Sequence, residues 1–160
     1  MMGKSEQLEL HCHNNSPVFA TIADLSAKGY VAAAGSVVLT HGWQNPVRPQ
    51  SGMGYLHVGF RHRLDMQLAQ TGSVEAYIST LLSKPYRIYD PGFRKRLLIY
   101  RCVKPFGGVI VEPANARDVP EIRCNLSNLG VAQTTASIYL VVTAYNKKAA
   151  QGAELWVQRR

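Results

Sequence analysis

The sequence predicts an α+β fold: a single domain over residues 1–160, with a mostly antiparallel β-sheet and two or three packed helices. Three observations lead to this prediction. Short apolar segments alternate with turn residues, one segment has the spacing of an amphipathic helix, and hydrophobic residues make up 46% of the chain. That share is sufficient for one hydrophobic core, and neither an internal repeat nor a low-complexity linker divides the 160 residues.

Residues 55–70 form the sharpest pattern. Their even positions are apolar from Leu56 to Leu68 except at His62, while their odd positions are mostly polar or basic. Side chains alternate between the two faces of a strand, so this pattern predicts a long β-strand with one buried and one basic face. In that register Phe60 is buried, His62 is a hydrogen-bonded and mostly neutral core histidine, and His57 lies on the opposite face.

A helix is predicted over residues 74–82. Ser73 is a good N-cap, and Glu75 lies in the first turn, where the helix dipole favours negative charge. The apolar residues recur at helical spacing along one stripe: Val74, Tyr77, Ile78, Leu81 and Leu82. Pro85 ends the helix, and the turn chemistry of residues 90–92 predicts that residues 86–92 form a loop.

Shorter patterns predict the remaining elements. Alternation at residues 8, 10 and 12 indicates a strand, and Ser16 and Gly29 bracket a helix over residues 17–28. Further strands are expected at residues 30–40, 97–103 and 109–111. Residues 137–145 and 153–158 are expected to form a terminal antiparallel pair.

Charge and cysteine content limit the function classes. The formal net charge is +8, so the expected partners are acidic: nucleic acid, an anionic membrane or an acidic protein face. Cys12, Cys102 and Cys124 are widely spaced and odd in number, which favours a reducing compartment over a disulfide framework. The first residues lack the apolar stretch of a signal peptide, and the longest apolar run, residues 138–142, is too short to span a bilayer. Any membrane contact is therefore expected to be peripheral.

The sequence contains no recognisable catalytic or metal-binding motif. His11 and His13 share a face of the expected strand while Cys12 points away, and no CxxC or HxxxH supplies further ligands, so a structural or surface role is favoured. Cys102 is expected to be a buried thiol. We therefore expect no enzyme, catalytic residues, metal, cofactor or small-molecule substrate. An enzyme whose site is assembled from distant residues stays an alternative, testable by screening for bound metal and hydrolytic activity.

Positive charge is concentrated between residues 61 and 104, which carry +6 of the total +8. One interpretation is a solvated face that keeps the protein soluble. The other is an anion-binding surface centred on residues 94–96 and interleaved with aromatic side chains, which suits phosphate contact or shallow membrane insertion. RNA would be bound through its backbone phosphates, since no nucleic-acid module is recognisable. The candidate binding residues are Arg61, Arg63, Lys84, Arg87, Arg94, Lys95, Arg96, Arg101 and Lys104.

A second candidate site is the loop of residues 41–49, which is too rich in proline for regular structure to be expected. It carries Trp43, followed by Pro46 and Pro49. Either the tryptophan covers the core or it anchors a partner, since tryptophans on loops are efficient interface anchors. We expect these three residues to mediate self-association.

The order of features over residues 56–103 resembles that of rhabdovirus matrix proteins, particularly small forms of the plant cytorhabdovirus type. A strand at 56–68 leads into a helix at 74–82, a Pro-Gly loop with a basic cluster at 90–96, and an apolar strand at 97–103. This resemblance implies a matrix-like domain that self-associates, binds and condenses the viral nucleocapsid, and links it to the membrane. It implies a homo-oligomer, viral nucleoprotein with its RNA and an anionic membrane surface as partners. The implied locations are the virion and the host cytoplasm, peripheral at membranes.

The alternative from another class is a small jelly-roll coat or movement protein of an RNA virus. Many apolar strands and a hairpin-like C-terminus favour it. The helix near residues 73–82 discriminates between the two, because a jelly roll carries helices only in its loops.

Overall fold

The structure, a computed structural model, describes residues 3–25, 33–92, 95–132, 136–146 and 153–157. It confirms the α+β fold. An eight-stranded sheet has the order β1-β3-β9-β8-β7-β6-β10, with β2 paired beside β3, and every strand pair is antiparallel except β3 with β9. Its strands are β1 Leu10–His11, β2 Val18–Ile22, β3 Gly35–Thr40, β6 Tyr86–Asp90, β7 Leu97–Arg101, β8 Gly107–Pro113, β9 Ser137–Tyr145 and β10 Ala153–Val157.

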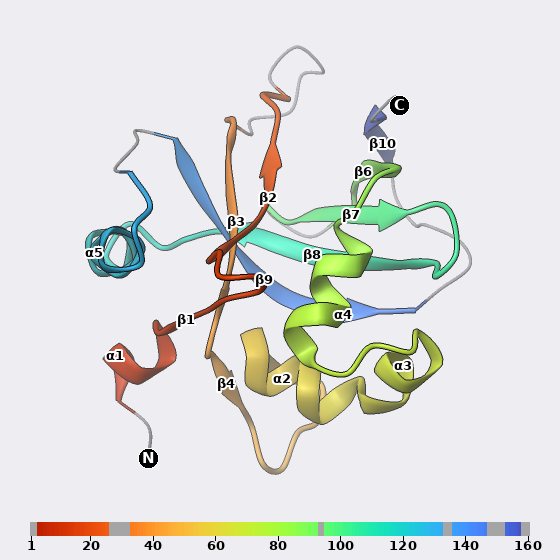
Figure 1. Cartoon of the computed structure of the whole chain (residues 1–160), viewed down its shortest axis with the longest axis horizontal. Helices are drawn as coiled ribbons and strands as arrows, with labels where there is room; N and C mark the ends of the chain where they lie inside the picture. The colour runs from red at the N-terminus through yellow and green to blue at the C-terminus, as the bar shows by residue number, and fades with distance from the viewer. Residues whose placement is uncertain (1–2, 26–32, 93–94, 133–135, 147–152, 158–160) are drawn as a thin grey trace.

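A small hairpin and five helices complete the described structure. The hairpin consists of β4 Trp43–Gln44 and β5 Gly52–Met53. The helices are α1 Lys4–Gln7, α2 Gly54–Arg61, α3 Arg63–Leu68, α4 Val74–Leu81 and α5 Val119–Asn128. In Figure 1, α4 lies in front of the sheet, α2 and α3 lie at its lower end, and α5 lies at the left. None of the helices in the described residues is long and apolar enough to cross a membrane.

Helix α4 confirms the predicted helix and its cap. The Ser73 hydroxyl accepts a hydrogen bond from the backbone N–H of Ala76 at 3.0 Å. Tyr77, Ile78 and Leu81 are fully buried in the larger core cluster, together with strand residues such as Ile99. A helix packed on one large sheet is not the architecture of a jelly roll, and the described strands do not form the two sheets that a jelly roll requires.

The predicted long strand at residues 55–70 is wrong, because these residues form α2 and α3. Its apolar side chains do not share one face: Val58 is fully buried, whereas Phe60 is 57% exposed and Leu64 is 73% exposed. The buried residues of α2 are Gly54, His57 and Val58, which have helical spacing. Val58 is the only β-branched residue in the segment, so local propensity gave the alternating pattern little support.

Three further predictions are corrected. Residues 18–22 form strand β2 instead of a helix, and β-branched and aromatic residues explain this outcome; residues 26–32, with the predicted stop at Gly29, lie outside the described part. Residues 86–90 form strand β6 instead of a loop. The elements of the expected terminal pair exist, but β9 pairs with β3 and β8 while β10 pairs with β6.

Strands β7, β8 and β9 lie where the sequence places strands, and β1 and β3 occupy parts of the predicted segments. Helix α5 was not predicted. It packs Ile122 and Leu126 against the second, smaller core cluster, on which Val38, Ile138 and Leu140 also converge. Pro120 in its first turn is the sequence signal that could have indicated it.

Helix α2 lies where β3 and β9 separate. The parallel register joins Gly35–Val38 to residues 137–140 only, and beyond it α2 contacts both strands and the β4–β5 hairpin. Gly42 and Gly54 have φ angles of +72° and +76°, and their backbones pass too closely for either to carry a Cβ atom. This crossing fixes the start of α2 against the end of β3.

Candidate active site at the end of α2

His57 points from α2 towards the β4–β5 hairpin and is 4% exposed. Its Nδ1 lies 2.7 Å from Oε1 of Gln44. The Gln44 amide nitrogen donates to the backbone carbonyl of Asn45, so its oxygen is the acceptor for His57. The His57 ring therefore carries its proton on Nδ1 and presents a lone pair on Nε2, which is the form that a general base requires.

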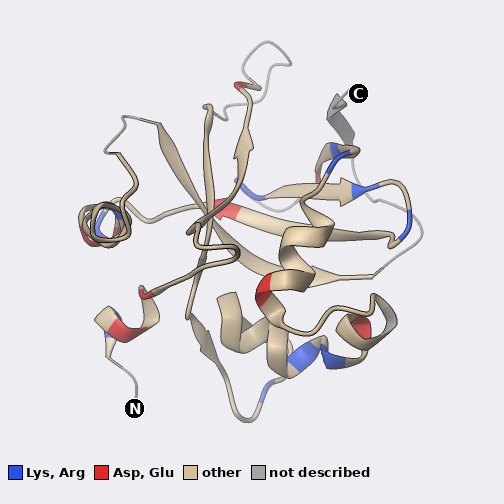
Figure 2. Ribbon diagram, in the orientation of Figure 1, with Lys and Arg blue, Asp and Glu red and all other residues tan. Residues whose placement is uncertain are grey.

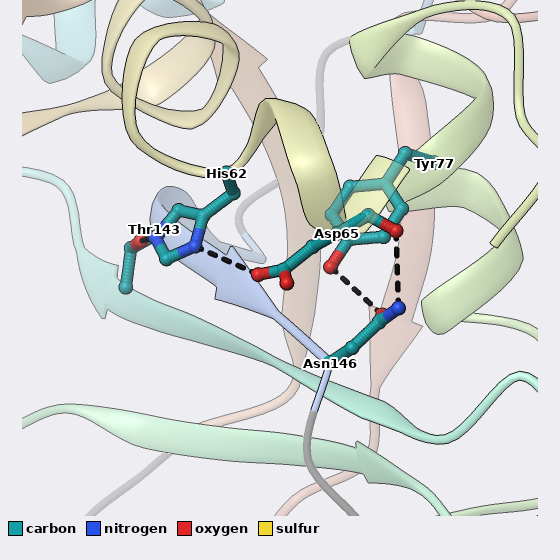
Figure 3. Close-up of polar contacts among 5 residues, drawn as sticks. All are labelled: His62, Asp65, Tyr77, Thr143 and Asn146. Carbon is teal, nitrogen blue, oxygen red and sulfur yellow. Dashed lines mark hydrogen bonds and ion pairs between the residues drawn. The ribbon is translucent and has the colours of Figure 1, made fainter. Parts of the chain in front are cut away.

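His62, at the junction of α2 and α3, is held at both ring nitrogens. Nδ1 lies 3.0 Å from Oδ2 of Asp65, and Nε2 lies 2.9 Å from Oγ1 of Thr143. A carboxylate can only accept, so Nδ1–H donates to Asp65 and Nε2 accepts from the Thr143 hydroxyl. The result is a Thr–His–Asp chain assembled from residues 81 positions apart, as Figure 3 shows.

The backbone of Asp65, the residue that binds His62, is itself held by a side chain. The side-chain amide of Asn146 donates to the backbone carbonyl of Asp65 at 3.0 Å, and the Tyr77 hydroxyl donates to Asn146 at 3.0 Å. Figure 3 shows these contacts joining α3, α4 and the end of β9. The chain anchors the backbone of Asp65 and so helps to hold this residue beside His62.

The two imidazoles are neighbours in an edge-to-face arrangement. Their ring centroids are 5.9 Å apart and their planes are inclined by 80°. The prediction that His57 and His62 lie on opposite faces and cannot act together is therefore wrong, because it depended on the strand register. The prediction that His62 is hydrogen-bonded is confirmed.

The surroundings of the two histidines shift their pKa values through different interactions. Burial, with the nearby His62 and Arg61, lowers the pKa of His57 to about 4. Burial also lowers the pKa of His62, but the hydrogen bond and the charge of Asp65 oppose this shift. Both rings are neutral at neutral pH, and only His62 has a carboxylate that stabilises its protonated form.

Arg61 and Arg63 lie beside this pair on α2 and α3, and both are exposed. The charge of Arg61 lowers the pKa of both histidines, which places its guanidinium within electrostatic range of each ring. These two are the predicted basic residues that the structure brings to the histidine pair. The other predicted basic residues in the described part are dispersed over the α4–β6 turn, β6, the segment just before β7, the end of β7 and the β7–β8 turn (Figure 2).

Residues 94–96, the predicted centre of the basic surface, do not share one environment in the structure. Arg94 lies outside the described residues, and Lys95 is exposed. Arg96 forms an ion pair with Glu112, with Nε 3.1 Å from Oε2. Both Lys95 and Arg96 line a cavity of about 650 Å³, together with Lys4, which is 3.2 Å from Asp118.

Arg101 has a structural role. Its guanidinium donates to the backbone carbonyls of Ser83, Lys84 and Lys104, so it joins the end of α4 to the turn after β7. The side chains of Lys84, Arg87 and Lys104 are exposed.

The proline-rich loop forms the β4–β5 hairpin, so the expectation of no regular structure there is wrong. Trp43 pairs with Met53 and is 39% exposed, and Pro46 and Pro49 are exposed in the connecting loop. The Trp43 side chain is thus partly covered by the protein and partly accessible to a partner.

A second polar cluster contains His11 of the His11-Cys12-His13 motif. His11 Nδ1 lies 3.3 Å from Glu75, and Nε2 lies 2.9 Å from Nδ1 of His41. The His11 ring also stacks on Tyr55, with centroids 3.9 Å apart. These contacts tie β1 to α2 and α4. Within the described residues, no three His, Cys, Asp or Glu side chains are grouped so that they could hold a metal ion.

Sequence reasoning missed Gln44, Asp65 and Thr143. One signal was available for Thr143: it is a polar residue inside the otherwise apolar run of β9. Nothing in the sequence could indicate that this run ends beside α2.

Comparison with known proteins gives no relative from which a role could be transferred. A scan against protein-family models, a search of curated proteins and a search of solved structures each find no match. The function is therefore argued from the geometry alone.

Proposed function

We propose that this protein cleaves the phosphodiester backbone of RNA without a metal ion, using His57 as general base and His62 as general acid. The observation that carries the proposal is the histidine pair, 5.9 Å apart, with a carboxylate on one member only and Arg61 close to both. Pairs of titratable groups with opposed environments are typical of acid–base sites.

RNA is the substrate class that suits such a site. The chain carries a net charge of +8 and therefore attracts polyanions. RNA supplies its own nucleophile, the ribose 2′-hydroxyl, so neither an activated water nor a covalent enzyme intermediate is required. DNA lacks this hydroxyl and is expected to bind without being cleaved.

The proposed reaction has one proton transfer at each histidine. Arg61 binds the phosphate, and Nε2 of His57 takes the proton from the 2′-hydroxyl as its oxygen attacks phosphorus. The bond from phosphorus to the 5′-oxygen breaks as protonated His62 exchanges the Thr143 contact at Nε2 for that oxygen and gives it the Nε2 proton, while Nδ1–H stays bound to Asp65. The products are a 2′,3′-cyclic phosphate and a 5′-hydroxyl. The anionic phosphate raises the pKa of both rings on binding, and Asp65 favours His62 as the protonated one.

The test is cleavage of a fluorescent single-stranded RNA, and of the DNA of the same sequence, in excess EDTA. The parent protein should cleave only the RNA. His57→Ala and His62→Ala should each lower the rate by about 10²–10⁴-fold, while His13→Ala, a histidine outside the site, should not. Activity that requires a divalent cation, or that survives both substitutions, would overturn the proposal.

A second candidate function is the one implied by the matrix-protein resemblance: a viral structural protein that self-associates, condenses nucleocapsid and attaches peripherally to a membrane. The exposed positions of Trp43 and Val47 on the hairpin and of Arg61 and Lys95 support it. The helical structure of α2 and α3 removes one of the four features on which the resemblance depends. Negative-stain microscopy of the protein with and without nucleocapsid tests this candidate: coated coils support it, and closed empty shells indicate a capsid.

A further inference from the structure

Exposed apolar side chains are concentrated in the segment that contains the histidine pair. In the described part of the chain five large apolar side chains are exposed, and four of them lie between residues 43 and 64: Trp43, Val47, Phe60 and Leu64. The same stretch contains three arginines, Arg48, Arg61 and Arg63, and no acidic residue. The next acidic residue, Asp65, has its carboxylate bound to His62. Apolar groups interleaved with positive charge are typical of surfaces that bind single-stranded nucleic acid.

Among these exposed apolar residues, Phe60 is the best placed to contact a substrate bound at the histidine pair. It lies three residues after His57 on α2, a spacing that makes the two side chains neighbours on the helix surface, and Arg61 is the next residue in the chain. The side chain is large, aromatic and 57% exposed, so most of its ring is available to a ligand.

We infer that Phe60 stacks on an unpaired nucleobase of the RNA whose phosphate is bound at Arg61, and that the substrate is therefore single-stranded. This inference rests on the proposed function and specifies its substrate. Bases inside a duplex are already stacked on each other and cannot reach an aromatic side chain, whereas unpaired bases can. An anionic membrane is the less favoured occupant, because the hydrogen-bonded histidine pair adjacent to Phe60 would have no role in membrane insertion.

The test separates binding from cleavage. The probe is a short single-stranded RNA in which every 2′-hydroxyl is methylated, so that it cannot be cleaved, with one 2-aminopurine base as a stacking reporter. Phe60→Ala should weaken binding by about tenfold and reduce the quenching of 2-aminopurine. Phe60→Trp should preserve both, and Phe60→Leu, which keeps the apolar character but loses the aromatic face, should behave like the alanine variant.

Three controls test whether the effect is specific to Phe60 and to single-stranded RNA. Leu129→Ala removes an exposed apolar side chain from the end of α5 and should leave binding unchanged. Binding to a duplex of the same sequence should be equally weak for the parent and for Phe60→Ala. Vesicles of phosphatidylserine and phosphatidylcholine should bind both proteins alike.

The stacking inference is overturned if Phe60→Ala or Phe60→Leu binds the single strand as tightly as the parent, if the duplex loses as much affinity, or if only vesicle binding falls. Because the methylated probe reports binding alone, a protein that binds it through Phe60 but never cleaves unmodified RNA would disprove the proposed function and leave the stacking intact. Phe60 is exposed, so its substitution is not expected to lower the melting temperature, and circular dichroism checks this.

Discussion

His57 and His62 are the same residue type placed in opposite roles by their neighbours. His57 is bound by the neutral amide of Gln44, and burial, His62 and Arg61 all lower its pKa. His62 is bound by the carboxylate of Asp65, which stabilises an imidazolium. The distinction comes from side chains on β4 and α3 and not from the histidines themselves, so exchanging the two partners would be expected to exchange their roles.

The depressed pKa of His57 predicts a loss of stability in mild acid. In the unfolded chain this histidine takes up a proton near pH 6.5, whereas in the folded protein it does so only near pH 4. The free energy of unfolding is therefore highest above pH 6.5 and falls as the pH is lowered towards 4. His57 contributes at most about 3 kcal/mol to this fall, and His62, whose pKa is also lowered, contributes in the same direction.

Urea denaturation at several pH values compares the parent with His57→Gln, whose side chain does not titrate. The variant should show a smaller loss of stability between pH 6.5 and pH 4. Identical pH dependence in the two proteins would mean that His57 is more solvated than its 4% exposure indicates.

Substitution of Thr143 tests whether this residue positions His62 or acts as a nucleophile. In the proposed mechanism its hydroxyl only orients the His62 ring, so Thr143→Ala should lower the cleavage rate by about tenfold or less, and Thr143→Ser should restore it. A threonine nucleophile predicts instead that Thr143→Ala loses as much activity as His62→Ala, with a covalent adduct on the parent protein visible by mass spectrometry. The comparison is made with the same RNA at saturating concentration.

At the scale of elements, α2 shows why an alternating pattern misled. Leu56, Val58 and Phe60 are apolar at every second position, which fits the two-residue period of a strand. Packing against the hairpin and β9 decided the outcome, and Gly59 allows α2 to approach Val74 of α4, where a Cβ atom would come within 3.3 Å of that side chain. Contacts between distant segments overrode the local pattern.

Two substitutions in α2 are expected to affect stability differently if residues 54–61 form a helix and alike if they form a strand. Val58 is fully buried and Phe60 is 57% exposed, so Val58→Asp should bury an unpaired charge and unfold or aggregate the protein, while Phe60→Asp should fold normally. On a strand both side chains would share a face, and both substitutions would be damaging. Melting temperatures and soluble yields decide between them. Equal losses in the two variants would contradict the helix.

At the scale of the whole molecule, the fold class and the locally encoded elements were predictable. Helix α4, with its Ser73 cap, and strands β7 to β9 are each determined by their own residues. The sheet order was not, because the parallel pairing of β3 with β9 joins segments about a hundred residues apart. The site depends on that pairing, since His62 meets Thr143 only where the two strands separate.

The net charge of +8 also governs whether copies of the protein can associate. Charge repulsion keeps copies apart, so self-association requires a surface that buries apolar area. Trp43 and Val47 are exposed on the β4–β5 hairpin, and Pro46 and Pro49 stiffen its loop, which limits the entropy lost on binding. Burying one indole at an interface stabilises it by roughly 2–4 kcal/mol.

Trp43→Ala should therefore remain monomeric in analytical ultracentrifugation under conditions in which the parent sediments as larger species. Leu129→Ala, a change of exposed apolar surface on α5, should associate like the parent. High salt should strengthen association if repulsion between the copies is the opposing force, because screening shortens its range. Assemblies that dissolve in high salt would instead be bridged by RNA or anionic lipid. If Trp43→Ala assembles as the parent does, the hairpin is not the interface.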